Sequence, residues 1–179
     1  MKHSHICKVF EAFEDDGRIC IVEENCSEGP LLQWLAKNKD KDLTKGGFLV
    51  QDKITDVLAC LVYALQYLHS SDKIHGQINA SNVLVNNGGT FKLGSISICS
   101  PNNLPPSPIS PESAIAAPEL FDNKPYSSAS DIWALGCLIH YLCTKQDFPV
   151  CAIQLCHSDR VVSYIFLTSL LQLSTMPLV

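Results

Sequence analysis

Three residues near the amino terminus carry side chains that can ligate a metal ion and occupy alternate positions. His3, His5 and Cys7 follow one another at steps of two, and in a β-strand that spacing places all three on one face. Imidazole nitrogen and thiolate sulfur are ligands of tetrahedral zinc. The neighbouring sequence offers no fourth ligand, and a plain strand face accounts for the same spacing. The strand interpretation is therefore favoured over a metal site.

Cysteine is frequent, with nine residues in the chain, at positions 7, 20, 26, 60, 99, 137, 143, 151 and 156. A disulfide framework requires an oxidising compartment, and residues 1–16 contain no apolar core of a signal peptide. No pair has the CxxC spacing. We therefore expect reduced cysteines, mostly buried as small apolar side chains, in a cytoplasmic protein.

Composition and charge exclude several classes of protein. The 179 residues are 46% hydrophobic and only 17% charged, which excludes a disordered chain and predicts a single packed domain. Asp and Glu number 18 against 13 Lys and Arg, so no basic stripe is available and nucleic acid is not expected as a partner. None of the 9 glycines forms a phosphate-binding loop of the GxGxxG or GxxxxGK type.

The elements expected to position any site begin with β-structure. Residues 6–13 and 18–24 are rich in β-branched and aromatic side chains and flank an Asp-Gly turn, which predicts a hairpin. A short helix is expected after Pro30, with Leu31, Leu32 and Leu35 on one side. The charged stretch 37–47 is expected to be an exposed loop.

Two long helices and a second hairpin follow. Residues 52–69 repeat apolar side chains at steps of three and four, the pattern of an amphipathic helix. Two short apolar runs around residues 86–89, Asn-Asn-Gly-Gly, predict the second hairpin. A proline-rich extended segment covers 101–111. The last helix is expected near residue 130, with Ile132, Leu135, Ile139 and Leu142 facing inward. Because no βαβ rhythm appears, the expected fold class is α+β.

Four strings in this order resemble the eukaryotic protein kinases. They are HGQINASNVLV (75–85), FKLGSIS (91–97), APEL (117–120) and SDIWALGCLIHYLCT (130–144), which stand where kinases carry the HRD catalytic loop, the DFG turn, the APE motif and an Asp that opens a buried helix. The strings FEDDGRICIVEE, KLG before the DFG position and NKPYSSASDIWALGCLIHYLCT are most similar to NIMA-related serine/threonine kinases. The resemblance implies a kinase-like fold, mainly the helical large lobe with a remnant of the small-lobe sheet.

Several catalytic positions depart from the family pattern. Gln77 stands at the position of the catalytic Asp, and an amide has no useful basicity near neutral pH. Asn79 stands at the position of the catalytic-loop Lys, and Ser95 at the metal-binding Asp of DFG. Asn82 is retained as a metal ligand. In addition, Gly76 replaces the Arg that receives an activation-loop phosphate in many kinases.

Other motif positions are retained and have structural roles in the family. Asp131 resembles the residue that holds the catalytic-loop backbone, although an acid in the first turn of a helix also interacts favourably with the helix dipole. His75 and Trp133 stand at structural positions. Glu119 normally pairs with a late Arg, and the only Arg beyond it is Arg160, so its partner stays open. Ser107 and Ser110, each before proline, are candidate phosphorylation sites or simply a surface loop.

These observations lead to a domain assignment and a function. We expect a partial kinase-like domain over 3–148, with a small-lobe remnant at 3–28, a large lobe at 29–148 and a divergent tail at 149–179. The resemblance places the glycine-rich loop, the phosphate-contacting Lys and its Glu partner before residue 1. We therefore expect a non-enzymatic, pseudokinase-like binding or scaffolding module. The alternatives are an ATP-dependent serine/threonine protein kinase or a non-functional truncated product.

Cofactors and partners follow from that expectation. No cofactor is expected, whereas ATP and Mg²⁺ are implied if the kinase alternative holds. An unidentified protein partner is expected, because an uncovered hairpin at 6–24 would expose apolar side chains and favour association or aggregation. Residues 161–179 contain no charge, but their many polar side chains make a membrane anchor the weaker interpretation.

Overall fold

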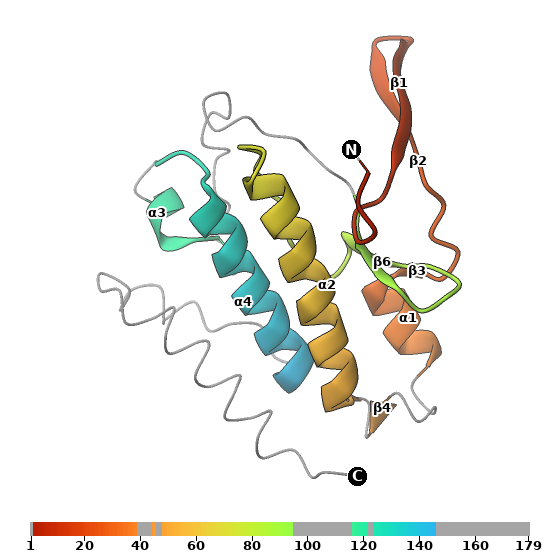
Figure 1. The fold of residues 1–179 in the computed structure, drawn as a ribbon, viewed down its shortest axis with the longest axis vertical. Coiled ribbons are helices and arrows are strands. Elements are labelled where there is room, and N and C mark those ends of the chain that lie inside the picture. Colours follow the sequence, from red (N-terminus) through yellow and green to blue (C-terminus); the bar gives the residue numbers. More distant parts are fainter. Residues whose placement is uncertain (1, 39–43, 46–47, 95–115, 122–123, 146–179) are drawn as a thin grey trace.

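The computed structural model of the chain describes residues 2–38, 44–45, 48–94, 116–121 and 124–145. Two long helices, α2 (Gln51–His69) and α4 (Ser128–Thr144), lie side by side, with the shorter α1 (Leu31–Lys37) on the other side of α2 (Figure 1). The short α3 (Pro118–Phe121) lies beside the amino-terminal end of α4. The mixture of helices and small antiparallel sheets confirms the predicted α+β class.

Helix α2 forms the centre of the core. Its apolar stripe is fully buried and packs against α4 and against the second hairpin, as the period of three and four predicts. The stripe consists of Ile54, Val57, Leu61, Ala64, Leu65 and Leu68. On the sheet side the ring of Phe91, 2% exposed, meets Trp34 of α1 edge-on at 5.8 Å between ring centroids. The core therefore joins α1, α2, α4 and the hairpin into one unit.

The second hairpin belongs to a three-stranded sheet of order β3-β6-β7. β6 (Val83–Val85) and β7 (Phe91–Leu93) pair as predicted, and the Asn86 side chain supports their turn by accepting bonds from the backbone N–H groups of Gly88 and Thr90. The sequence did not predict the third strand, β3 (Gly29–Pro30), which pairs with β6. Because it has only two residues, it carries no readable alternation.

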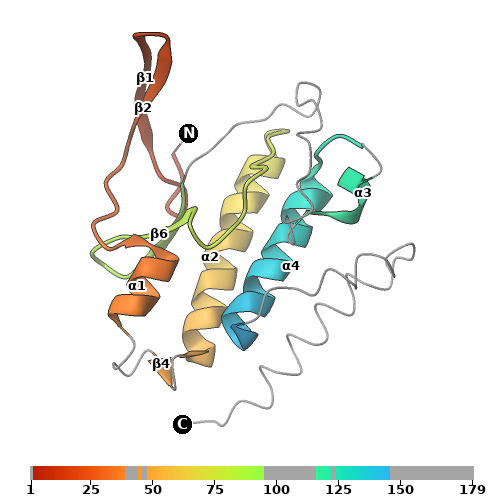
Figure 2. The same cartoon turned by 180° about the vertical axis from the view of Figure 1, so that it is seen from behind.

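The first hairpin projects away from the helices (Figures 1 and 2). It consists of β1 (Val9–Asp15) and β2 (Arg18–Glu23), joined by Asp16 and Gly17, both with positive φ. Residues 6 and 7 were expected in its first strand but lie beside β7, where the Cys7 N–H donates to the Leu93 carbonyl. Apolar side chains are exposed on both of its faces, including Phe10 at 59% and Ile19 at 80%.

At the start of α4, the buried residues differ from those that the sequence predicts. Leu135, Ile139 and Leu142 are buried, but Ile132 is 39% exposed. Trp133, next to it, is buried instead and packs with Ala117, Leu120 and Cys137 in a second small cluster. The helix begins with a capping box between Ser127 and Ser130. The inward face therefore shifts by one residue where α4 meets α3.

Several sequence expectations concern short or undescribed segments. Part of the expected loop at 37–47 pairs as β4 (Thr44–Lys45) with β5 (Phe48–Leu49). The proline-rich segment 101–111, with Ser107 and Ser110, and the tail 149–179 lie outside the described residues. Within the described part of the chain, no helix is long and apolar enough to cross a membrane. The cysteines in that part are all free thiols.

Candidate active site

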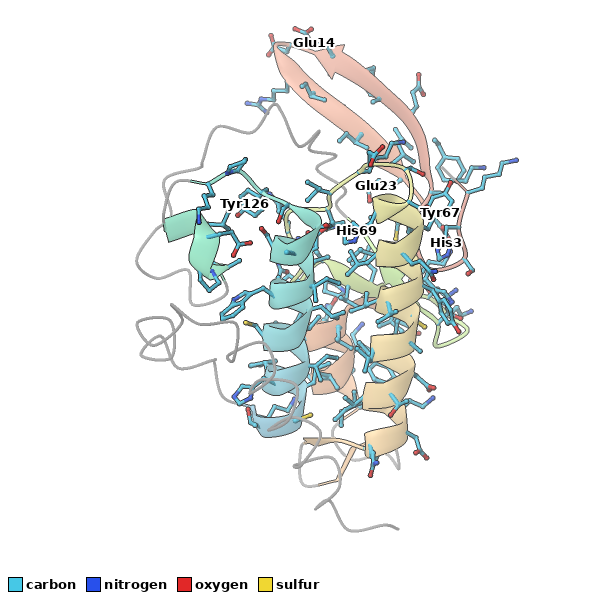
Figure 3. The ribbon with its side chains drawn as sticks, turned by 60° about the vertical axis from the view of Figure 1, so that its left-hand side comes forward. His3, Glu14, Glu23, Tyr67, His69 and Tyr126 are labelled. Atoms are coloured by element: carbon cyan, nitrogen blue, oxygen red, sulfur yellow. The ribbon has the colours of Figure 1, made fainter. Side chains whose placement is uncertain are left out.

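The loop that follows α2 is anchored to the first turn of α4 by one carboxylate. Asp131 is 1% exposed, and its two oxygens accept the backbone N–H groups of His75 at 2.9 Å and Gly76 at 2.8 Å. His69 lies at the end of α2 (Figure 3). Its ring Nε2 is 2.9 Å from Asp131 Oδ2. Gly76 has a φ of 77°, a conformation that glycine adopts without strain. Asp131 thus holds loop and helix end together.

His75 fixes the loop from its other side. The side chain is fully buried, its Nε2 lies 3.0 Å from the Gly94 carbonyl oxygen, and its Nδ1 accepts the Gln77 N–H at 3.2 Å. These two contacts require the tautomer that carries its proton on Nε2. Burial lowers the pKa of His75, partly opposed by the Gly94 carbonyl and by Asp131. A neutral imidazole therefore links the loop to the chain that follows β7.

The loop closes on itself through two asparagine side chains. Asn82 donates from Nδ2 to the Gln77 carbonyl oxygen at 2.8 Å. The Oδ1 of Asn79 accepts the N–H groups of Ser81 at 2.9 Å and Asn82 at 3.0 Å, an Asx turn that holds the backbone bend. Gln77 is exposed. The structure therefore places Gln77, Asn79 and Asn82 in one hydrogen-bonded turn.

One residue of this turn fits the role of a metal ligand. Because Asn82 uses its Nδ2 within the loop, its Oδ1 is oriented by the loop and suits one neutral position of a Mg²⁺ shell. Ser95, the second predicted position, lies outside the described residues. The part of the chain that the structure describes brings no three His, Cys, Asp or Glu side chains together as a metal cluster. His3 and His5 instead stack on Tyr67 and Tyr63 of α2.

A cavity of about 580 Å³ opens beside Gln77. The loop supplies residues 77–82 to its wall, α1 contributes Leu32, and α4 contributes Cys137, Leu138 and Tyr141. All of these lining side chains are uncharged. Sequence reasoning missed the residues from α1 and α4, because only the fold brings positions so distant in the chain to one wall.

Glu119 finds a partner that the sequence left open. Its Oε1 accepts the Ser130 hydroxyl at 2.7 Å, and Ser130 belongs to the capping box that starts α4. Ser130 is itself buried. Glu119 therefore links α3 to the first turn of α4, the helix that carries Asp131. Buried Trp133 packs at the same contact between α3 and α4.

The sequence matches the protein kinase domain family over residues 1–162. It is 33% identical over 148 residues to serine/threonine-protein kinase Nek1 of Mus musculus, covering 80% of this chain and 12% of that protein. It is 32% identical over 153 residues to Nek5 of Homo sapiens, covering 80% and 20%. For Nek3 of Mus musculus the identity is 30% over 149 residues, with 80% and 27% covered.

The chain therefore belongs to the protein kinase family, and its similarity to NIMA-related kinases is confirmed. It spans between 12% and 27% of the length of these relatives. The expectation that the protein is not an enzyme is wrong, because the relatives are named serine/threonine kinases, which are enzymes. The Gln77 amide therefore stands at the position of the catalytic Asp in a member of an enzyme family.

Proposed function

We propose that this chain forms the catalytic-loop part of a serine/threonine protein kinase, which transfers the terminal phosphoryl group of ATP to hydroxyl groups of proteins. The observation that carries the proposal is the loop at 75–82, which Asp131 holds rigidly beside an open cavity. Preorganised positioning is the main contribution of a protein to this reaction. The names of the relatives support the same reaction.

Gln77 makes the proposed transfer slow, because it is not a general base, but it can still orient the accepting hydroxyl. The phosphoryl group passes through a loose transition state, so the group beside the accepting hydroxyl contributes through orientation as well as proton removal. The side-chain amide oxygen of Gln77 can accept a hydrogen bond from the substrate hydroxyl, but it cannot take the hydroxyl proton at neutral pH. The missing general base costs a factor of about 10² to 10⁴ in rate.

ATP and Mg²⁺ are the cofactors of this proposal. When bound, Mg²⁺ neutralises charge that develops on the phosphoryl oxygens. Asn82 would supply one ligand through Oδ1, while its Nδ2 stays on the Gln77 backbone and keeps that oxygen oriented. Because the ligand is neutral, most of the shell would come from phosphate and water oxygens. We therefore expect metal binding that depends strongly on the nucleotide.

The test uses the complete chain, purified and incubated with labelled ATP, Mg²⁺ and a dephosphorylated protein substrate. We expect slow labelling of serine and threonine that falls at least about tenfold in the Asn82→Ala variant, since the loop and its metal ligand are lost together. Asn87→Ala is the matched control, because Asn87 is an exposed residue of the β6–β7 turn and does not line the cavity. Labelling at the level of a protein-free reaction would overturn the proposal.

A second role, in association with a second copy of this chain, is favoured by the hairpin β1–β2. Its exposed apolar side chains include Phe10, Phe13, Ile19 and Ile21, and grouped apolar side chains at a surface mark interaction sites. We expect the purified chain to associate in light scattering, and the double variant Phe10→Ser and Ile21→Ser to associate less. A wild-type chain that remains a monomer at all concentrations tested would contradict this role.

A further inference from the structure

Two thiols meet at the base of the hairpin β1–β2. Cys7 lies just before β1 and Cys26 just after β2, and their Sγ atoms are 3.5 Å apart although the residues are 19 positions apart in the chain. Both are free cysteines, 2% and 8% exposed. The distance is that of two sulfur atoms in direct contact, and a disulfide bond of about 2.05 Å requires them to approach by roughly a further 1.5 Å.

The backbone on both sides holds this pair in place. The Cys7 N–H donates to the Leu93 carbonyl of β7 at 2.9 Å, and the Cys26 carbonyl accepts the Gly29 N–H at 2.9 Å. Between the thiols and the hairpin, the Glu24 N–H donates to the Lys8 carbonyl at 2.8 Å. The Glu24 carboxylate also pairs with Lys92 of β7. The contact between the two thiols is thus set by the fold of the hairpin base.

We propose that Cys7 and Cys26 form an oxidation site that closes to a disulfide when the folded protein meets a hydroperoxide. In the first step one sulfur attacks a peroxide oxygen, the O–O bond breaks, and a sulfenic acid and one water form. In the second step the other sulfur attacks the sulfenic sulfur, the S–O bond breaks, and the disulfide and a second water form. Two thiol protons and two electrons thereby reduce one hydrogen peroxide to two waters.

The two thiols take different parts in this reaction. Cys26 is the more exposed of the two, so we assign it the first attack on the peroxide. Burial, the hydrogen bond with Cys26 and then the nearby Glu24 and Glu23 charges hold the pKa of Cys7 far above its usual range. A thiol of that kind is a poor first nucleophile, but its sulfur already touches the site where the sulfenic acid forms. Cys7 therefore resolves the intermediate.

The experiment maps the linkage in the complete chain. The reduced protein is treated with an equal amount of hydrogen peroxide and is then unfolded in urea while the remaining thiols are alkylated, because Cys7 is buried in the folded chain. The chain is cut with trypsin and a glutamate-specific protease. Cleavage after Arg18 and Glu24 separates Cys20 from Cys26. We expect a peptide pair joining Cys7 to Cys26, two hydrogens lighter than the separate peptides, to account for most of the Cys7 that has lost its free thiol.

Two controls separate the folded geometry from random pairing. Oxidation in concentrated urea should reduce the share of the Cys7–Cys26 product severalfold, because the chain has nine cysteines to combine. The Cys20→Ser variant should keep the product, and Cys26→Ser should abolish it. The proposal is overturned if Cys7 stays fully alkylatable while other thiols oxidise, or if urea leaves the share of the product unchanged. The comparison of the wild-type chain oxidised with and without urea tests the proposal even if a serine variant fails to fold.

Discussion

The hairpin β1–β2 and the loop at 75–82 are held in opposite ways. Each turns at a glycine with positive φ, Gly17 at 71° and Gly76 at 77°. The hairpin pairs residues close in sequence and leaves its side chains exposed. The loop has hydrogen bonds within its own residues, but it is fixed to the rest of the chain by distant ones: Asp131 lies 55 and 56 positions from the residues it binds, and Gly94 lies 19 positions from His75. The hairpin can therefore form or fray by itself, whereas the loop depends on the whole helical body.

The largest expected effect is on the free energy of unfolding, and it compares one phenylalanine of the helical body, on which the loop depends, with one of the hairpin β1–β2. Phe91 is 2% exposed and Phe13 is 45% exposed. Phe91→Ala should lower the free energy of unfolding by about 3–5 kcal/mol, because it removes a core ring and leaves a cavity. Phe13→Ala should change it by less than about 0.5 kcal/mol. Urea unfolding of both variants makes the comparison, and equal losses would contradict it.

The second effect concerns the carboxylate that anchors the loop. Asp131→Ala leaves the N–H groups of buried His75 and half-buried Gly76 without their acceptor, so we expect a loss of about 3 kcal/mol in the free energy of unfolding. Asp131→Asn keeps one acceptor oxygen and should lose less. Hydrogen exchange should accelerate at residues 75–77 and stay unchanged in β1 and β2. Equal acceleration in both regions would show that the hairpin shares the anchor.

A smaller effect is expected in the hairpin turn. A Cβ at Gly17 would meet no atom within 4 Å, so Gly17→Ala costs only the strain of positive φ, about 1–2 kcal/mol. We expect faster hydrogen exchange across β1 and β2 with little change in the global unfolding midpoint. Gly17→Asn is the matched control, since asparagine tolerates this conformation better. A large drop in the global midpoint would mean that hairpin and body unfold together.

The smallest effect is a dependence of stability on pH through His75. Because burial lowers its pKa in the folded chain, the unfolded chain binds a proton that the folded chain does not. Its stabilising contribution is therefore complete above the unfolded pKa of about 6.5 and is lost as the pH falls below it, at no more than about 1.4 kcal/mol per pH unit. Urea midpoints at about pH 7.5 and 5.5 should show the loss, and His75→Gln should reduce it. A higher midpoint at the lower pH would contradict this assignment.

The sequence predicted those parts of the fold whose signals are local. The period of residues 52–69 and the Asp-Gly turn at Gly17 each carry their information within a few neighbours. The shift at the start of α4, where Trp133 is buried and Ile132 is exposed, depends on α3 packing against it. The strand β3 likewise exists only through its pairing with β6.

The site could be predicted only as a set of positions. Motif spacing placed Gln77, Asn79 and Asn82 in one loop, but it carried no information on the walls of the cavity or on the Ser130 hydroxyl that partners Glu119. The contact between Cys7 and Cys26 was also unpredictable, because it results from two chain segments that meet only below a folded hairpin. The cavity walls, the partner of Glu119 and the contact between the two thiols all depend on residues that are distant in the chain.

The most direct test of the proposed function compares the initial rates of phosphoryl transfer of the wild-type chain and the Gln77→Asp variant at equal concentrations of folded protein. The loop already holds position 77 beside the cavity, so the account predicts slow transfer by the wild type. It also predicts a rate at least about tenfold higher for the variant, which regains a general base. No transfer by either protein, or equal rates for both, would contradict the account.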